Sequence, residues 1–242
     1  MYKYIISGIN GNTGTLLKDK FLNYETYSNN MQSSDADIFI HLAAKTTGSY
    51  TEIIESNIYY LSQIIDFCKT QNIKNIIFFS AISINTHTDL YNTSKLLAEQ
   101  MLKASGLKVL VLRLPMILTQ ESNNGILNRI ANQLINNEDI ILHNANKAFN
   151  NFIDINEIYN FINTYTFIKE YERINLASNN DWTLEKVIEF LKIKLDSTSS
   201  ININRDDFPY FNVCTQKAIK EYSYTPIDNA EKLSNWVKTR KK

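Results

Sequence analysis

The feature that most constrains the fold is a regular alternation of short apolar runs with segments of helical periodicity along the first half of the chain. The apolar runs are YKYIISG (2–8), DIFIHLAA (37–44), NIIFFS (75–80) and GLKVLVLRLP (106–115). The clearest helical pattern between them has one apolar stripe along residues 51–71. Fully apolar strands that alternate with helices are typical of a parallel sheet with helices on both faces. We therefore predict an α/β fold, a Rossmann-like doubly wound parallel sheet.

The alternation loosens after Pro115, and we expect the later segments to build a small C-terminal lobe. Helices are predicted near 122–138, after a cap at Asp154 or Asn156, after a cap at Asp181 or Thr183, and as a pair broken at Pro226. A late strand is predicted at 173–178 and a surface loop at 195–207. The predicted division places 1–118 in a core, completed by roughly 138–178, and assigns 119–137 and 179–242 to the lobe.

The charge balance argues against two classes of partner. The chain has 25 basic and 25 acidic side chains, so its net charge is zero. A bulk attraction to nucleic acid or to an anionic membrane is therefore not expected. No apolar run approaches the roughly 18 residues needed to cross a bilayer, and Gly8 interrupts the first run too early for a signal peptide. We expect a cytoplasmic protein.

Cysteine and histidine are too sparse to indicate a metal site. Cys68 and Cys214 form no CxxC motif, so neither a zinc site nor a disulfide framework is predicted. His41, His87 and His143 are too scattered along the sequence to suggest a shared metal ion.

A glycine-rich turn joins the first predicted strand to the first predicted helix. The stretch SGINGNTGT places Gly8, Gly11 and Gly14 at GxxGxxG spacing. Glycine permits a tight turn and a close approach of the backbone to a ligand, and a helix N-terminus favours a pyrophosphate. Further side-chain donors are available from Asn10, Asn12 and Thr13. Since the first strand-to-helix turn of such folds is where dinucleotides bind, we predict a cofactor site here.

The sequence does not separate NAD from NADP. Glu25 lies in YETYSNN, but the second strand is expected to end near Ser28–Asn30, and no arginine stands there to meet a 2′-phosphate. The cofactor is therefore predicted as NAD or NADP, without a choice between them.

Tyr91 and Lys95 stand four residues apart in DLYNTSKLLAEQML, so they share one face of a predicted helix. A phenol has an unperturbed pKa of about 10. A nearby lysine ammonium favours the phenolate and lowers this pKa, so that the tyrosine can exchange a proton near neutral pH. Such a pair can protonate a carbonyl oxygen while a hydride arrives, or do the reverse. An isolated YxxxK pattern is common in helices, so its surroundings decide its weight.

The glycine turn comes first, HLAA (41–44) follows one predicted strand, and YNTSK (91–95) follows another. With these segments, the chain resembles the extended short-chain dehydrogenase/reductase family, and within it the NAD-dependent epimerase/dehydratase group that acts on nucleotide sugars. The resemblance extends over nearly the whole chain. Its matching segments are the glycine turn, HLAA (41–44), Asn57 in ESNIYYLSQII, NIIFFSAIS (75–83), YNTSK (91–95), VLRLPMIL (111–118), FNNFIDINEIYNFI (149–162) and INLAS (174–178) with WTLEKV (182–187).

The resemblance implies a role for each matching residue. Tyr91 would be the acid/base, and Lys95 would lower its pKa and hold the nicotinamide ribose. The three glycines would hold the pyrophosphate. The other cofactor contacts implied by the resemblance are Leu42, Ala43, Ala44, Asn57, Ser80, Pro115 and Met116, of which Asn57 helps to order the active site.

Two departures from the family pattern bear on activity. The family usually carries Ser-Ser or Ser-Thr at the end of the strand that corresponds to NIIFFS (75–80), and the second hydroxyl binds the substrate carbonyl. Here the pair reads Ser80-Ala81, so the second hydroxyl is missing. Ser80 or Ser83 can substitute, so both are candidate catalytic residues; loss of such a donor costs a few kcal/mol of transition-state stabilisation. The connection from Ser80 to Tyr91 is also short, and the segment 21–35 is expected to lack a strand–helix unit.

Two classes of function compete. The main prediction is an NAD(P)-dependent oxidoreductase that reduces a 4-keto nucleotide sugar for a bacterial surface polysaccharide. A nucleotide-sugar 4-epimerase would use the same residues, whereas a dehydratase is disfavoured because Ile82-Ser83 stands where an acidic pair is expected. The other class is a cofactor-binding sensor or partner protein with weak or no turnover. Ala81 favours it, and the intact Tyr91 and Lys95 oppose it.

Either form can dimerise through helices 51–70 and 91–104, which would pack as a four-helix bundle across a two-fold axis, as in the family. Interface or ordinary core is expected for Tyr59, Tyr60, Leu96 and Leu97. In the lobe, the candidate contacts for a substrate diphosphate are Arg129, Arg205 and Lys217.

Overall fold

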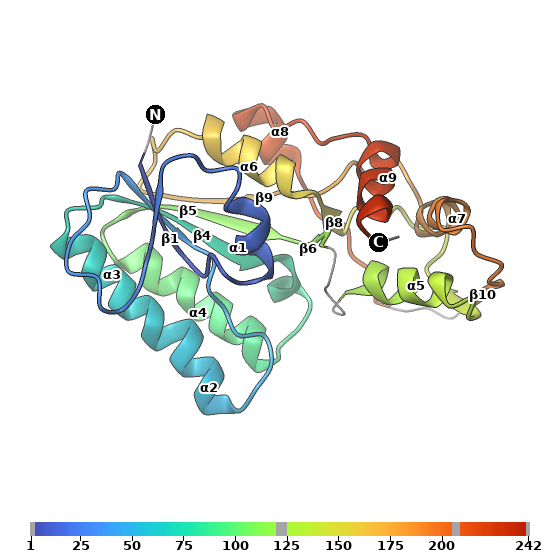
Figure 1. Ribbon diagram of the computed structural model, residues 1–242, viewed down its shortest axis with the longest axis horizontal. Coiled ribbons are helices and arrows are strands. Elements are labelled where there is room, and N and C mark those ends of the chain that lie inside the picture. The colour runs from blue at the N-terminus through green and yellow to red at the C-terminus, as the bar shows by residue number, and fades with distance from the viewer. Residues whose placement is uncertain (1–2, 120–124, 205–208, 241–242) are drawn as a thin grey trace.

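A six-stranded parallel sheet forms the larger part of the molecule, with the strand order β2-β1-β3-β4-β5-β9. The computed structural model describes residues 3–119, 125–204 and 209–240. The strands are β1 (Tyr4–Ser7), β2 (Tyr24–Thr26), β3 (Ile38–His41), β4 (Asn75–Ala81), β5 (Lys108–Leu114) and β9 (Tyr171–Asn175). Figure 1 shows helices on both sides of this sheet, which confirms the predicted doubly wound α/β fold.

The helices divide between the two faces according to the alternation of side chains along the strands. On one face lie α1 (Asn12–Leu17), α6 (Ile155–Thr164) and α8 (Gln216–Tyr222), and on the other lie α3 (Tyr60–Thr70) and α4 (Leu90–Ala104). Along β4, Ile77 and Phe79 pack on the face covered by α1, α6 and α8, whereas Ile76 and Phe78 pack on the face covered by α3 and α4. Both faces of the strand are therefore buried, which explains why its sequence is apolar throughout.

The segment predicted as one helix over 51–70 contains a π-helical turn. The chain runs from α2 (Tyr50–Ile54) through a π-helix at Glu55–Tyr59 into α3. A capping box between Ser49 and Glu52 starts the helix. A π-turn holds one extra residue, and such turns are frequent at functional sites. Asn57 lies within it and is buried.

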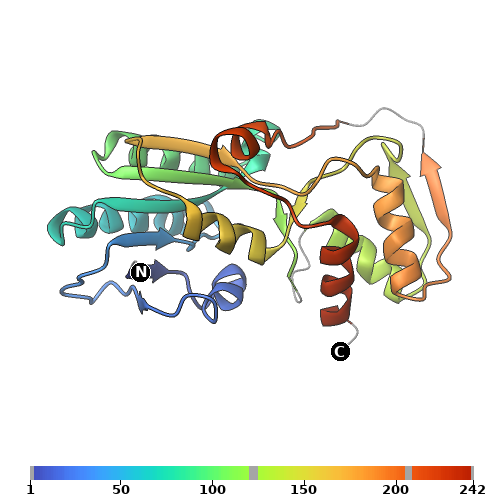
Figure 2. The same ribbon diagram turned by 90° about the horizontal axis from the view of Figure 1, so that it is seen from above.

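The lobe has its own apolar core. It consists of α5 (Ile126–Ile135), α7 (Leu184–Lys194) and α9 (Asn229–Arg240) around a parallel pair of strands, β7 (Ile140–His143) and β10 (Ile201–Asn204). A second short pair, β6 (Met116–Ile117) with β8 (Phe152–Ile153), lies between the sheet and the lobe. Figure 2 shows the lobe beside the carboxyl ends of the sheet strands. Asp154 caps α6 and Thr183 caps α7, and α8 and α9 flank Pro226, as predicted.

Three segments lie elsewhere than the sequence indicated. The predicted surface loop 195–207 contains β10, which pairs with β7. β7 itself belongs to the lobe, although 138–178 was assigned to the core, and α8 packs on the core through Ala218, although 179–242 was assigned to the lobe. The ININ pattern of β10 is too short and polar to signal a strand. The segment forms a strand because it pairs with β7, which lies far away in the sequence.

The segment 21–35 contains the second strand of the sheet, although it was expected to lack a strand–helix unit. β2 pairs with β1 and ends at Thr26, before the predicted end at Ser28–Asn30. All of this segment is described, and it contains no helix. The expected loss is therefore of a helical crossover, and β2 stays as the edge strand of the sheet.

Candidate active site

A cleft of about 1300 Å³ opens between the carboxyl ends of the strands and the lobe. Ligands of open α/β sheets bind at this end of the strands. The predicted site residues that line the cleft are Gly8, Gly11, Asn12, Thr13, Gly14, Leu42, Ala43, Ala44, Ser80, Ser83, Tyr91, Lys95, Pro115 and Met116. Two predicted cofactor contacts, Asn10 and Asn57, lie outside this lining. The fold thus brings together residues from five separate segments.

Two of the three glycines are required by the packing of the turn. Gly8 has φ +75°, and a Cβ there would lie 2.5 Å from the backbone nitrogen of Ala43. A Cβ on Gly14 would lie 2.3 Å from the carbonyl oxygen of Gly8. Both neighbours are backbone atoms, so any larger residue would force the turn open. A Cβ on Gly11 would meet only the carbonyl of Gly8, at 3.3 Å, on the cleft side of the turn.

Lys95 is buried and tied to the sheet. Its Nζ donates to the carbonyl oxygen of Phe79 at 2.8 Å and lies 4.6 Å from the ring centroid of Phe78 and 6.0 Å from that of Tyr91. Burial lowers the pKa of Lys95 to about 7, although the Glu99 carboxylate opposes this shift. The Lys95 side chain is therefore held in place, and near neutral pH only part of the molecules carry it in the protonated form.

The environment of Tyr91 acts opposite to the sequence argument. Burial, followed by the charge of Asp89, raises the pKa of the Tyr91 phenol to about 12. The expected lowering by Lys95 is not seen: the Lys95 Nζ lies 6.0 Å from the centre of the Tyr91 ring, and desolvation of the phenolate is the largest cause of the shift. Tyr91 is therefore protonated in the empty cleft and can donate a proton. It can act as a base only when a positive charge nearby stabilises its phenolate.

Asn57 acts behind the cleft wall. Its Oδ1 accepts from the backbone nitrogen of Lys45 at 2.7 Å, and its Nδ2 donates to the carbonyl of Lys45 at 3.0 Å and to Ser94 Oγ at 2.9 Å. Ser94 Oγ donates to the carbonyl of Tyr91 at 2.7 Å. Asn57 therefore holds the segment after β3 against α4, which fits the predicted ordering role and not a direct contact with a cofactor.

Ser80 is committed to a buried ionic network that the sequence reading missed. Its Oγ donates to Glu99 Oε1 at 2.6 Å, and Arg113 donates to both Glu99 oxygens at 2.9 and 2.8 Å. The Arg113 Nη1 also donates to Asn85 Oδ1 at 2.9 Å. Glu99 follows Lys95 by four residues on the same helical face, and this spacing was the available signal. The network joins α4, β4 and β5 beneath the cleft.

The lobe supplies the opposite wall. Arg129 is exposed and lines the cleft, together with His143, Asn144 and Tyr210. Lys217 lies elsewhere, because its Nζ contacts Glu172 beside β9. Arg205 lies outside the described residues. Of the two candidate diphosphate contacts that the structure describes, Arg129 is the one at the cleft.

The histidines take three different places. His41 is buried, bonds to Ser7 Oγ through Nδ1 at 2.6 Å, and has its pKa lowered by burial to about 3. His87 is exposed at the edge of the cleft, and His143 lies on the lobe wall. Across residues 3–119, 125–204 and 209–240, no cluster of three His, Cys, Asp or Glu side chains could hold a metal ion. Over the same ranges, no helix is long and apolar enough to cross a membrane.

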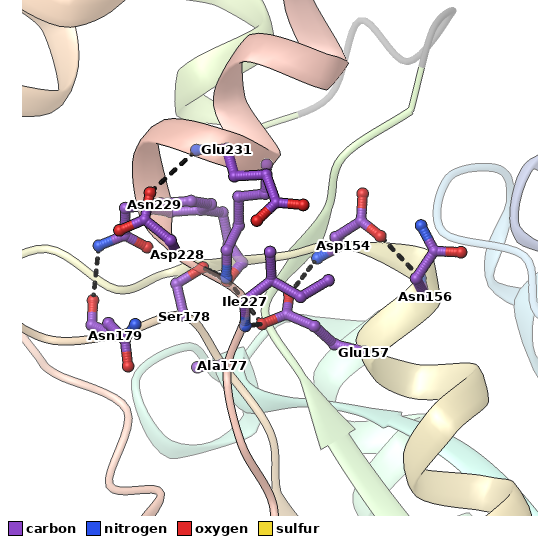
Figure 3. Close-up of polar contacts among 12 residues, drawn as sticks. Asp154, Asn156, Glu157, Ala177, Ser178, Asn179, Ile227, Asp228, Asn229 and Glu231 are labelled. Atoms are coloured by element: carbon purple, nitrogen blue, oxygen red, sulfur yellow. Dashed lines mark hydrogen bonds and ion pairs between the residues drawn. The ribbon is translucent and has the colours of Figure 1, made fainter.

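A second buried ion pair fastens the lobe to the core. Lys232 of α9 and Glu157 of α6 are both fully buried, with Nζ and Oε1 2.7 Å apart. Lys232 also donates to Ser178 Oγ at 2.8 Å, and Glu157 accepts from the backbone nitrogens of Ile227 and Asp154. Figure 3 shows Glu157 facing Ser178 and Ile227 where the segments that cross between the two parts meet. No sequence motif indicated this pair.

Comparison with known proteins gives a local sequence match. A family model described as "Male sterility protein", of an NAD-binding type, matches residues 82–137. This segment includes Tyr91 and Lys95. A search of the curated proteins finds no match.

Comparison with solved structures covers nearly the whole chain. UDP-glucuronic acid 4-epimerase from Bacillus cereus in complex with NAD matches with a TM-score of 0.78 at 15% identity, over 98% of each chain. UDP-glucose 4-epimerase from Thermotoga maritima matches with a TM-score of 0.79 at 14% identity, over 98% of each chain. RMD from Pseudomonas aeruginosa complexed with NADPH matches with a TM-score of 0.78 at 14% identity, over 99% of this chain and 98% of that one. The chain therefore has the fold of these three solved structures.

Proposed function

We propose that the protein is an NAD(P)-dependent enzyme that acts on a nucleotide-activated sugar. The observation that carries the proposal is the continuous cleft from the glycine turn, past Tyr91 and Lys95, to Arg129 in the lobe. At about 1300 Å³ it exceeds the roughly 300–1,000 Å³ of pockets for one drug-sized ligand, so a dinucleotide and a second ligand can share it. The names of the structures that share the fold support the same class of ligands.

The residues of the sheet side fit a dinucleotide. The turn at Gly8 and Gly14 has no room for side chains and exposes Gly11 and Thr13 to the cleft, where the pyrophosphate would lie. Lys95 would meet the nicotinamide ribose. The nicotinamide supplies the hydride acceptor and donor when it is bound. The choice between NAD and NADP is left to measurement, because Glu25 of β2 is engaged by Lys3 and Ser34.

Between the two oxidoreductase reactions, the 4-epimerase has more support than the 4-keto reductase that was the main prediction. Several structures with this fold are named as UDP-sugar 4-epimerases. A different protein with this fold, RMD, is in complex with NADPH. In an epimerase, Tyr91 takes the proton of the sugar hydroxyl as the hydride leaves carbon, and returns a proton when the hydride comes back to the other face. The protein is thus expected to need no net supply of reduced cofactor. A role in surface polysaccharide synthesis and a cytoplasmic location stay predictions.

The test begins with titration of NAD⁺, NADH and NADPH into the purified protein. UDP-glucose, UDP-N-acetylglucosamine and UDP-glucuronic acid are then assayed for 4-epimerisation by chromatography, and UDP- and dTDP-4-keto-6-deoxyglucose for NADH or NADPH oxidation. Tyr91→Phe is the active-site variant, and Tyr171→Phe, a half-buried tyrosine outside the cleft, is its matched control. Epimerisation that is lost only in Tyr91→Phe supports the proposal. Failure to bind any of the cofactors would refute it.

A cofactor-binding sensor is the second candidate, and Ala81 is the observation that favours it. The usual hydroxyl is absent at this point of the cleft wall, and the neighbouring Ser80 hydroxyl is bonded to Glu99. In the same assays, a sensor would bind a cofactor and turn over no nucleotide sugar, whether or not Tyr91 is intact.

We also propose that the face formed by α2, the π-turn and α4 pairs two copies of the chain. Tyr59 is 62% exposed and Leu97 is 46% exposed, and Tyr50, Ile54 and Leu96 are also exposed. Tyr60 instead packs inward against Tyr27 and His41. In Figure 1 these helices lie together on the side of the sheet away from α6. Apolar side chains gathered on one exposed face are typical of an interface.

A further inference from the structure

The loss of a hydroxyl at Ala81 raises the question of what this part of the cleft offers to a ligand instead. Ser80 lines the cleft, but its proton goes to the buried Glu99 carboxylate at 2.6 Å. Ser83 is half-buried, lines the same wall and lies in the 3₁₀ helix Ile82–Asn85 that follows β4. Of these two serine hydroxyls, that of Ser83 is the one that a ligand can reach without breaking an ionic hydrogen bond.

A chain of hydrogen bonds sets the direction in which the Ser83 hydroxyl points. Ser83 Oγ lies 2.5 Å from Asn92 Oδ1, and Asn92 Nδ2 lies 2.7 Å from Asp89 Oδ2. Asp89 also accepts from the backbone nitrogen of Asn92 at 2.9 Å as the N-cap of α4, and this bond lowers the pKa of its carboxyl group. Asp89 is thus a carboxylate, and it can only accept hydrogen bonds.

This carboxylate decides which end of the Asn92 amide faces Ser83. The NH₂ group must face Asp89, because two acceptors at 2.7 Å would repel each other. The amide oxygen then faces Ser83 and takes its only proton. Asn92 is buried between the half-buried Ser83 and the exposed Asp89, so its amide is held by the packing around it. The Ser83 oxygen is left with its lone pairs for the cleft.

The segment that carries Ser83 is held in place. The Ser83 carbonyl accepts from the backbone nitrogens of Thr86 and His87, each at 2.9 Å, and Arg113 donates to Asn85. The hydroxyl is therefore fixed before a ligand arrives, and little ordering is needed on binding.

We propose that Ser83 binds a hydroxyl group of the sugar as a hydrogen-bond acceptor, and that Asn92 and Asp89 are positioning residues that set this polarity. The inference rests on the proposed function and deepens it, because it names what this wall recognises. The site would select a sugar that presents a hydroxyl donor to Ser83 and would disfavour one that presents only an acceptor. Donation to the reacting oxygen is then left to Tyr91.

The test uses the cofactor-loaded protein and calorimetric binding of UDP-glucose, UDP-N-acetylglucosamine and GDP-mannose, with the 3- and 4-deoxyfluoro analogue of each. Fluorine cannot donate a hydrogen bond. For the sugar that binds, one analogue should bind about three- to tenfold more weakly, the effect of one neutral hydrogen bond. In Ser83→Ala this ratio should fall to about one, and Ser83→Thr should restore it.

Asp89→Ser separates positioning from structure. A serine there still caps α4 but no longer orients the Asn92 amide, so the Ser83 proton is released. The ratio between hydroxyl and fluoro sugars should therefore shrink, while a purely structural effect would weaken both equally. The inference is overturned if Ser83→Ala weakens both sugars alike, or if Asp89→Ser leaves the ratio unchanged. If the cofactor binds and no nucleotide sugar does, the proposed function fails, and this inference with it.

Discussion

Removal of the Lys232 ammonium should destabilise the protein strongly. Lys232→Met keeps the length and apolar volume of the side chain, so it opens no large cavity. It leaves a fully buried Glu157 carboxylate without its cation at 2.7 Å. Breaking a buried pair costs about 3–5 kcal/mol. Glu157 keeps the backbone donors of Asp154 and Ile227, so we expect the lower end, about 3 kcal/mol.

Urea unfolding at pH 7 measures this cost. With a slope of about 3 kcal/mol per M, the midpoint should fall by about 1 M. Lys238→Met, an exposed position on the same helix, is the matched control and should change stability by less than about 0.5 kcal/mol. Glu157→Gln added to Lys232→Met removes the stranded charge and should recover most of the loss.

The pH dependence gives a second check with a defined sign. Burial raises the pKa of Glu157 even though Lys232 opposes the shift, so removal of Lys232 raises it further. A carboxyl group whose folded pKa is raised destabilises the fold fully above that folded pKa; the cost shrinks as the pH falls and vanishes below the unfolded pKa of about 4.3. The cost of Lys232→Met should therefore shrink as the pH falls from 7 towards 5. A cost below about 1 kcal/mol at pH 7, a cost independent of pH, or a double variant less stable than the single one would refute the reasoning.

Three further predictions concern the cleft and the exposed helical face. Tyr91→Phe should lower turnover by about 10²–10⁴-fold with little change in the dissociation constant of the cofactor, measured by single-turnover kinetics and titration; an active variant would exclude Tyr91 as the acid/base. Gly14→Ala places a Cβ 2.3 Å from the carbonyl oxygen of Gly8, so cofactor titration should show affinity lost by at least about tenfold; Gly106→Ala, which has open space but φ +77° and lies outside the cleft, adds backbone strain alone and should leave cofactor affinity unchanged. Tyr59→Glu with Leu97→Glu should convert a dimer to a monomer in light scattering, and a wild-type monomer would contradict the proposed pairing.

Much of the sheet could be predicted because its signals are local. Four apolar runs became β1, β3, β4 and β5, since a strand buried on both faces must be apolar along its whole length. The glycine turn and the YxxxK helix were also visible, because a tight turn and a shared helical face depend on residues within a few positions of each other. The caps Asp154 and Thr183 follow the same rule.

The tertiary structure decided what depends on distant partners and on burial. β10 is a strand only because β7 lies beside it, and Glu157 and Lys232 tolerate full burial only because the fold brings them together. Sequence spacing predicted that Lys95 would lower the pKa of Tyr91, but desolvation, which no local pattern reports, raises it. The sequence by itself determined the α/β class and the residues that gather at the cleft. Only the packed structure determined their protonation and which serine hydroxyl faces a ligand, because both follow from long-range contacts and the exclusion of water.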